Sequence, residues 1–247
     1  MNRKLRRFVF VPIAAALLFV AVAPSLHAAD AQPIATGAAS LPPLSAEQIV
    51  ARLSYNNQQR AAALRAYDGK RSYSLEYRGF PSNREAAMEV VAHYTAPESK
   101  SFDVVAGSGS KMIQQKVFAK LLESEREAAH PENQRQTALN TDNYNFTYLG
   151  SRPSAYGGCY LLAVEPKRDN KFLYRGEICV NGVDFAVESI DAEPAKNPSF
   201  WIKKTRIVHR YQKVGQFWLP ATNQTVTNVR LGGTATLKIN YSNYELR

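Results

Sequence analysis

The chain is poor in the side chains on which catalytic and metal sites depend. It has two cysteines and four histidines in 247 residues, and no two histidines have metal-ligand spacing. It lacks a Gly-x-Ser-x-Gly elbow, a phosphate loop with its lysine, and paired carboxylates in an apolar surround. We therefore expect no enzyme, no catalytic residue, no metal and no cofactor. A histidine–carboxylate pair in a cleft would revive the hypothesis of a secreted hydrolase.

A block of basic residues is also missing. The formal net charge is +10, but the cations are spread along the chain, whereas a nucleic-acid-binding protein gathers them into a patch. We expect no nucleic-acid partner. A solvated basic face is the simplest interpretation, and peripheral attraction to an anionic membrane stays open as an alternative.

Only the beginning of the chain has a long hydrophobic run. Four cations within residues 3–7 precede the apolar stretch Phe8–Ala23, and small residues follow at Ala28-Ala29. This layout is typical of a cleavable secretory signal peptide, because the run is short for a membrane span of about 20 residues. We expect residues 1–28 to be the signal and 29–44 a flexible linker; an uncleaved anchor is the alternative.

The two cysteines predict a disulfide. Cys159 and Cys179 flank a polar turn centred on Asp169, and a three-residue hairpin loop with Asn170 in the left-handed conformation would place them directly opposite each other. In an oxidising compartment such thiols join. The absence of a Cys-x-x-Cys spacing argues against a redox-active pair.

Two helices are expected from side-chain periodicity. Ser45 and Gln48 form a capping box for a helix to about Ala66, ended by Asp68-Gly69. A second helix is predicted from Lys111 to Ala129, where His130-Pro131 stops it. The run Gly107–Ser110 is interpreted as a flexible connection before it, and Glu123–Glu127 as a solvated helix face.

Strands occupy most of the remaining chain. We expect Arg71–Arg78, Ala86–Thr95 and Ser101–Ala106 between the helices, and a meander from Asn143 to Tyr244. Along Phe200–Gln212, one parity holds Trp201, His209 and Tyr211 and the other holds basic residues, as in a sheet with one covered face. About ten or eleven strands are more than a flat open sheet usually contains, so we expect the sheet to curl. The sequence predicts an α+β fold, a half-open curved barrel with helices on its concave side.

The concave apolar face must be filled by side chains, helices or a ligand. We expect the stripe of the second helix and the aromatic rows of the strands to line an apolar ligand-binding cavity. The candidate lining residues are Phe118, Leu121, Leu122, Tyr174, Trp201, Tyr211 and Trp218.

Short segments in the second half carry a family resemblance. They are Glu193–Ile202, His209-Arg210-Tyr211, Phe217-Trp218-Leu219-Pro220 and Ile239-Asn240-Tyr241. Together they resemble a poorly characterised bacterial branch of the outer-membrane lipoprotein-sorting proteins, the LolA-like/LolB-like superfamily. The resemblance covers Lys171 to the last residue, and earlier only the order of elements agrees. It implies one half-barrel domain over residues 45–247 whose cavity can hold acyl chains, and no site residue is carried over.

Two functions remain open at this stage. The first is an exported periplasmic carrier or chaperone that holds the acyl chains of a lipid or lipoprotein between the sheet and the helices. The second is an envelope interaction or sensor module with a packed core, no lipid ligand and an envelope protein as its partner. A connected void under the helices would favour the first.

Overall fold

A computed structural model describes residues 41–97, 99–196, 202–230 and 232–247 of the chain. The predicted signal, most of the linker and Trp201 lie outside the described residues. The strands are β1 (Ala66–Gly79), β2 (Arg84–Thr95), β3 (Ser99–Gly109), β4 (Tyr144–Arg152), β5 (Cys159–Pro166), β6 (Tyr174–Asn181), β7 (Val187–Pro194), β8 (Ile202–Val214), β9 (Phe217–Val229) and β10 (Gly233–Leu246). The helices are α1 (Ala46–Ala63), α2 (Lys111–Ile113), α3 (Ala119–Ala129) and α4 (Pro131–Thr137).

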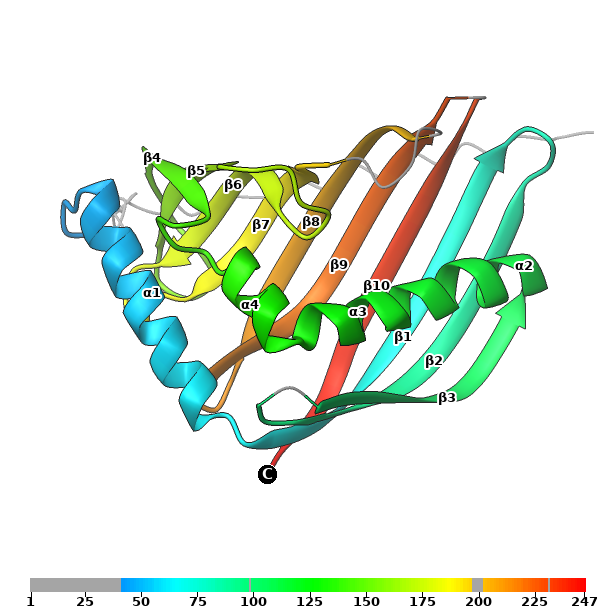
Figure 1. Ribbon diagram of the computed structural model, residues 1–247, viewed down its shortest axis with the longest axis horizontal. Coiled ribbons are helices and arrows are strands. Elements are labelled where there is room, and N and C mark those ends of the chain that lie inside the picture. The colour runs from blue at the N-terminus through cyan, green and yellow to red at the C-terminus, as the bar shows by residue number, and fades with distance from the viewer. Residues whose placement is uncertain (1–40, 98, 197–201, 231) are drawn as a thin grey trace, which may run out of the picture. The chain divides into compact units, whose positions relative to one another are not determined.

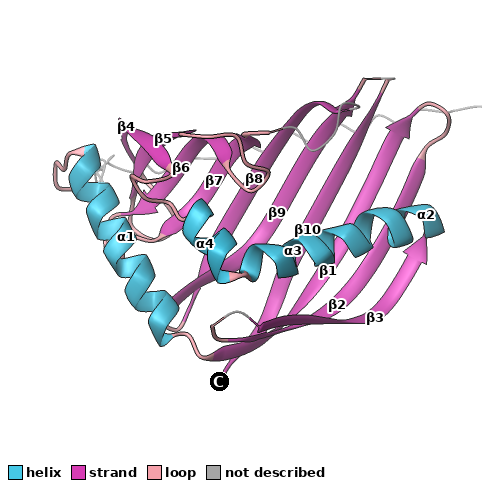
Figure 2. Cartoon of the chain, in the orientation of Figure 1, coloured by secondary structure: helices cyan, strands magenta, loops and turns pink. Residues whose placement is uncertain are grey.

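All ten strands form one antiparallel sheet. Their order is β3-β2-β1-β10-β9-β8-β7-β6-β5-β4, so β3 and β4 are its edges and the sheet does not close. The pairing of β1 with β10 joins the first three strands to the C-terminal meander. The sheet curves, and the helices cross one side of it (Figure 1, Figure 2). The predicted α+β half-open barrel is confirmed.

Helix α1 begins where its capping residues predict. The Ser45 side chain accepts a hydrogen bond from the Gln48 backbone N–H, and the Gln48 side chain accepts one from the Ser45 N–H. The helix ends at Ala63, before the predicted stop. Asp68 and Gly69 lie inside β1, because both pair with β2 and a ladder of backbone hydrogen bonds outweighs the turn preference of these residues.

The second predicted helix is continuous from Lys111 to Ala129. A π-helical turn, Gln114–Phe118, joins α2 to α3. Proline stops the helix as expected, and Pro131 starts α4. The run Gly107–Gly109 is part of β3, where it pairs with Ala86–Met88, so its interpretation as a flexible connection was wrong. Gly109 has φ +78°, and a side chain there would collide with the Glu85 carbonyl.

The predicted disulfide is present, but its hairpin register differs by two residues. Cys159 lies opposite Asn181, and Cys179 lies opposite Leu161, so the two cysteines bridge diagonally with Cα atoms 5.5 Å apart. The loop is longer than expected, because β5 ends at Pro166 and β6 begins at Tyr174. Within it, the Asn170 side chain accepts a hydrogen bond from the Phe172 N–H. Asn170 is absent from the described non-glycine residues with positive φ. A shift by two preserves the faces of both strands.

Three hydrophobic clusters form the core of the described residues, and the two larger ones lie under the helices. Under α1, Ile49 and Leu53 pack against strands β5 and β6, including Leu162 and Ile178. Under the long helix, buried residues from α2 to α3 pack on β1, β2 and β10; they include Ile113, Phe118, Leu122, Tyr73, Met88 and Ile239. Each helix therefore covers a different end of the sheet.

Candidate functional site

A large apolar cavity lies between the long helix and the sheet. Its volume is about 740 Å³, within the range of ~300–1,000 Å³ typical of ligand pockets. The lining residues come from β1, the β1–β2 turn, the start of β2, the long helix and strands β8, β9 and β10. They are Leu75, Tyr77, Phe80, Pro81, Arg84, Met112, Ile113, Val117, Leu121, Ile202, Thr225, Thr227, Val229, Ala235 and Leu237.

The floor of this cavity follows from strand alternation. Leu75 and Tyr77 on β1 lie opposite Leu237 and Ala235 on β10, and these in turn lie opposite Thr225 and Thr227 on β9. Alternate residues of a strand share a face, so these rows meet under the helix. The roof is the apolar stripe of the helix, to which Ile113, Val117 and Leu121 belong.

Ile202 lines the cavity, although the alternation of β8 would place its side chain on the other face of the sheet. In a regular strand it would share the outward face with Lys204, which is exposed. A register shift between these two residues and β9 interrupts the alternation, and Ile202 lines the cavity. A local bulge of this kind leaves no clear mark on the hydrophobic pattern.

The mouth of the cavity carries exposed apolar side chains. Phe80 is 74% exposed and Met112 is 47% exposed. Tyr77 positions the β1–β2 turn by donating a hydrogen bond to the Phe80 carbonyl at 2.6 Å. At this end the sheet extends past the helix (Figure 1), and the exposure of the lining residues Phe80 and Met112 indicates that the cavity opens to solvent here.

A buried charged cluster fastens α3 to the sheet. Glu125 on α3 accepts hydrogen bonds from Arg71 Nη1 on β1 at 2.6 Å and from Lys100 Nζ on β3 at 2.9 Å. Tyr73 donates to the same carboxylate at 3.3 Å. The Arg71 side chain is only 3% exposed. The interpretation of Glu123–Glu127 as a solvated face was therefore wrong for Glu125, because the helix rotates this position towards two cations.

The proximity of opposite charges favours the ionised forms of Arg71 and Glu125. Burial opposes the ionised guanidinium of Arg71, but the Glu125 carboxylate outweighs it and raises the pKa. Burial likewise works against the ionised Glu125, yet Lys100 and Arg71 lower its pKa. Burial lowers the pKa of Lys100. One carboxylate thus compensates two cations in a region of low dielectric constant.

His209 of β8 is half-buried as a residue, but its ring nitrogen Nε2 is shielded from solvent. This atom is buried without a hydrogen-bond partner in the described part of the chain. The ring stacks on Tyr211 and Tyr241, with ring centroids 4.5 and 6.1 Å away. Burial lowers the pKa of His209 to about 4, with Glu125 opposing the shift and Arg71 adding to it. The imidazole is neutral at physiological pH.

The other strand histidine, His93, forms the histidine–carboxylate pair that a hydrolase would need. Its ring nitrogens lie 2.7 Å from Asp68 and 3.2 Å from Asp103. Its neighbour Ala92 belongs to the buried concave row, so alternation places His93 on the convex face. The pair does not line the large cavity, and this placement does not support a hydrolase.

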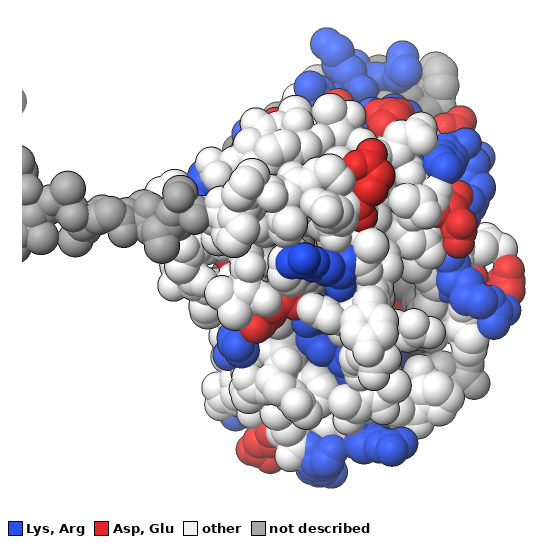
Figure 3. All heavy atoms as spheres, turned by 90° about the vertical axis from the view of Figure 1, so that its left-hand side faces the viewer, with Lys and Arg blue, Asp and Glu red and all other residues white. Residues whose placement is uncertain are grey.

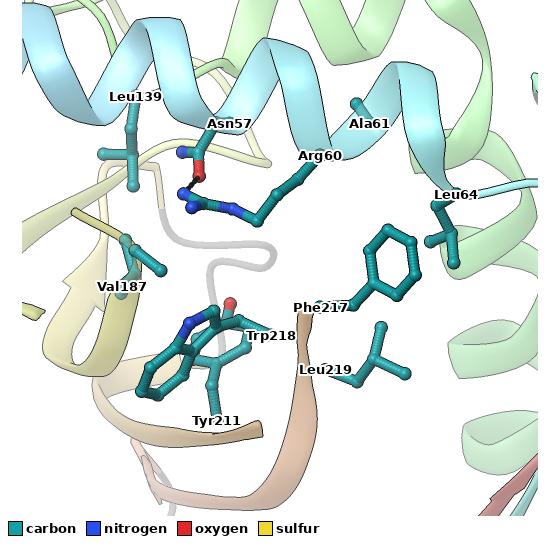
Figure 4. A pocket seen from close by; sticks show the side chains of 11 residues that line it. Asn57, Arg60, Ala61, Leu64, Leu139, Val187, Tyr211, Phe217, Trp218 and Leu219 are labelled. Carbon is teal, nitrogen blue, oxygen red and sulfur yellow. Dashed lines mark hydrogen bonds between the residues drawn. The ribbon is translucent and has the colours of Figure 1, made fainter. Parts of the chain in front are cut away.

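A smaller pocket lies between α1 and the β8–β9 hairpin. It has a volume of about 290 Å³, and Figure 4 shows Arg60 and Asn57 reaching from α1 towards the rings of Tyr211 and Trp218. Arg60 donates to Asn57 Oδ1 at 2.6 Å and to the backbone carbonyl of Asp184 at 2.9 Å. The guanidinium thus ties α1 to the loop before β7.

The predicted lining residues separate into different regions. Leu121 lines the large cavity, and Tyr211 and Trp218 line the smaller pocket. Phe118 and Leu122 are buried beneath the helix. Tyr174 packs in the cluster under α1, beside Tyr144. Trp201 lies outside the described residues. The candidates are therefore divided: the described aromatic residues of the strands lie near α1, and the residues of the long helix lie at the other end of the sheet.

Several broader features of the described chain bear on its chemistry. No three His, Cys, Asp or Glu side chains in its described part are grouped so that they could hold a metal ion. None of the helices in that part combines the length and apolar character needed to span a bilayer. On the face seen in Figure 3, basic and acidic side chains are interspersed among uncharged ones.

Comparison with known proteins gives matches among solved structures alone. No protein-family model matches the chain, and no curated protein matches it. A DUF1329 family protein from Desulfovibrio piger is 13% identical, with 81% of this chain and 92% of that chain covered and a TM-score of 0.39.

Two further solved structures are similar to this chain at still lower sequence identity. An outer membrane lipoprotein-sorting protein domain from Vibrio parahaemolyticus is 9% identical, with 78% of this chain and 91% of that chain covered and a TM-score of 0.37. A LolA superfamily protein from Nitrosomonas europaea is 10% identical, with 83% and 94% covered and a TM-score of 0.34. The resemblance seen in the sequence is thus also found among solved structures, at low identity.

Proposed function

We propose that this protein is an exported periplasmic carrier or binding protein for the acyl chains of a lipid or lipoprotein. On this proposal residues 1–28 are the cleaved signal and residues 45–247 the binding domain. The observation that carries it is the apolar cavity of about 740 Å³ between the helix and the sheet. A cavity this large and this apolar is costly to leave filled with water, and a hydrocarbon chain suits it.

The energetics favour a long chain. Each buried methylene contributes about 0.8 kcal/mol, so a chain that buries ten of them gains about 8 kcal/mol before the costs of association. Those costs amount to roughly 4–15 kcal/mol. A chain of a few carbons would not bind measurably, whereas hexadecyl chains are long enough to do so.

The test combines a search for endogenous ligand with a designed block of the cavity. Native mass spectrometry of protein purified from its own membrane fraction should show a co-purifying lipid. The neutral dye N-phenylnaphthylamine should bind and be displaced by hexadecanoate. The variant Ala235→Trp fills the cavity floor and should abolish dye binding.

A matched control separates blocking from unfolding. Ala87 lies on β2 and is exposed on the opposite face of the sheet, so Ala87→Trp makes the same change without entering the cavity. This variant should bind dye as the natural chain does. Finding no co-purifying lipid and no displaceable dye in the natural chain would refute the carrier proposal.

One observation favours the alternative, an envelope interaction module. Edge strand β3 exposes Val104 and Val105, which are 58% and 66% exposed. An edge strand with exposed apolar residues can pair with a strand of another protein. Under this alternative, substituting Val105 by lysine would abolish partner capture, while Ala235→Trp would leave it unchanged.

A further inference from the structure

One charged side chain lines the apolar cavity within the described part of the chain. The residues of β2 that face the helix are Ala86, Met88, Val90 and Ala92, and all four are buried. Arg84 precedes them with the same parity and lies opposite Tyr77 of the cavity floor. It therefore ends an otherwise apolar row at the mouth, where it is exposed.

This arginine differs from its neighbour in its partners. Arg78 lies on the outer face of β1 and pairs with Glu76 at 3.3 Å and with Glu85 at 3.6 Å. By contrast, no described carboxylate lies within ion-pair distance of Arg84. The side chain takes no part in holding the described structure together, so its five donors remain available at the mouth.

We propose that the cavity selects amphiphiles with an anionic head group, carboxylate or phosphate, and that Arg84 binds this head while the chain enters the cavity. The inference rests on the proposed function and specifies its ligand. A planar guanidinium donates two parallel hydrogen bonds to a carboxylate or phosphate. The exposed side chains of Phe80 and Met112 flank the same mouth and would contact the first methylenes.

The positive charge of Arg84 at the mouth argues against cationic and uncharged head groups. A quaternary ammonium would be repelled by Arg84, and an uncharged hydroxyl would gain only an ordinary hydrogen bond. Because the site is open to water, the preference should be moderate and should weaken with added salt.

The test compares four head groups attached to the same hexadecyl chain. Hexadecanoate, hexadecyl phosphate, hexadecanol and hexadecyltrimethylammonium, each below its micellar concentration, compete with the neutral dye. In the natural chain we expect both anions to bind about five times more tightly than hexadecanol, with the ammonium weakest. The stronger of the two anions identifies the head, carboxylate or phosphate.

Two arginine variants decide the assignment. Arg84→Gln should remove the preference for anions and leave hexadecanol binding unchanged. Arg78→Gln removes a nearby cation from the outer face and should keep the preference. If Arg84→Gln retains the preference, or if hexadecanol binds the natural chain as tightly as the anions do, the head-group inference is wrong while the carrier proposal stands. If no hexadecyl compound displaces the dye, the carrier proposal fails as well.

Discussion

Replacement of Glu125 by glutamine tests whether the buried charged cluster stabilises the fold. The substitution keeps the shape of the side chain and removes its charge. It leaves Arg71 and Lys100, whose side chains are 3% and 19% exposed, without a described carboxylate partner. Both cations then repel each other in a region that water reaches poorly.

The expected cost follows from burial. Breaking a buried ion pair on one side typically costs about 3–5 kcal/mol, because an uncompensated charge remains. Glu125 is 26% exposed, so partial hydration places the expected loss near the lower end, at about 3 kcal/mol. With a urea m value of about 2 kcal/mol/M, the unfolding midpoint should fall by roughly 1.5 M.

Glu127 on the same helix provides the control. It pairs with Lys171 at 2.7 Å, but these side chains are 44% and 53% exposed. Removing an exposed pair costs about 0–1 kcal/mol, so Glu127→Gln should scarcely move the midpoint. Urea unfolding of both variants at pH 7, followed by circular dichroism, makes the comparison. Equal midpoints for the two variants would refute the argument that burial gives Glu125 its importance.

Three further predictions concern other parts of the fold. The folded chain keeps His209 neutral down to its pKa of about 4, whereas the unfolded chain protonates this side chain below its ordinary pKa of 6.5. The free energy of unfolding should therefore fall by up to about 3 kcal/mol between pH 6.5 and pH 4. Thermal melts of His209→Phe should show a flatter dependence on pH. A double substitution of Cys159 and Cys179 by serine should cost about 3 kcal/mol through the freed loop, measured by urea unfolding, and dithiothreitol should then have no further effect. Phe118 is fully buried and Phe80 is 74% exposed. Phe118→Ala should therefore lower the free energy of unfolding by about 3–5 kcal/mol, and Phe80→Ala by less than about 1 kcal/mol. Similar melting temperatures for the two variants would contradict this difference in packing.

Much of the architecture could be predicted from local patterns. The capping box at Ser45, the stop at Pro131 and the exposed row of basic residues on β8 depend on residues a few positions apart, and all three are confirmed. Pro220 lacks the backbone N–H that a regular ladder needs, and the register between β8 and β9 shifts next to it. Local rules succeed here because each concerns hydrogen bonds or faces within one element or hairpin.

The candidate site was less predictable. Of the described residues that were expected to line one cavity, Leu121 lies there, while Tyr211 and Trp218 line another pocket and Tyr174 packs under α1. Periodicity shows which face of a strand is covered. It does not show which helix covers that face, because this depends on how the sheet curves.

By itself, the sequence determined the compartment we expect, the curled antiparallel sheet, the covered face of its strands and the pairing of the cysteines. These follow from composition and from periods of two and 3.6 residues. The tertiary structure alone decided that Glu125 faces two buried cations, that Ile202 turns inward at a bulge, and that Arg84 ends at the mouth of a cavity. Each of these depends on elements distant in the chain, whose relative placement is set by packing over the whole sheet.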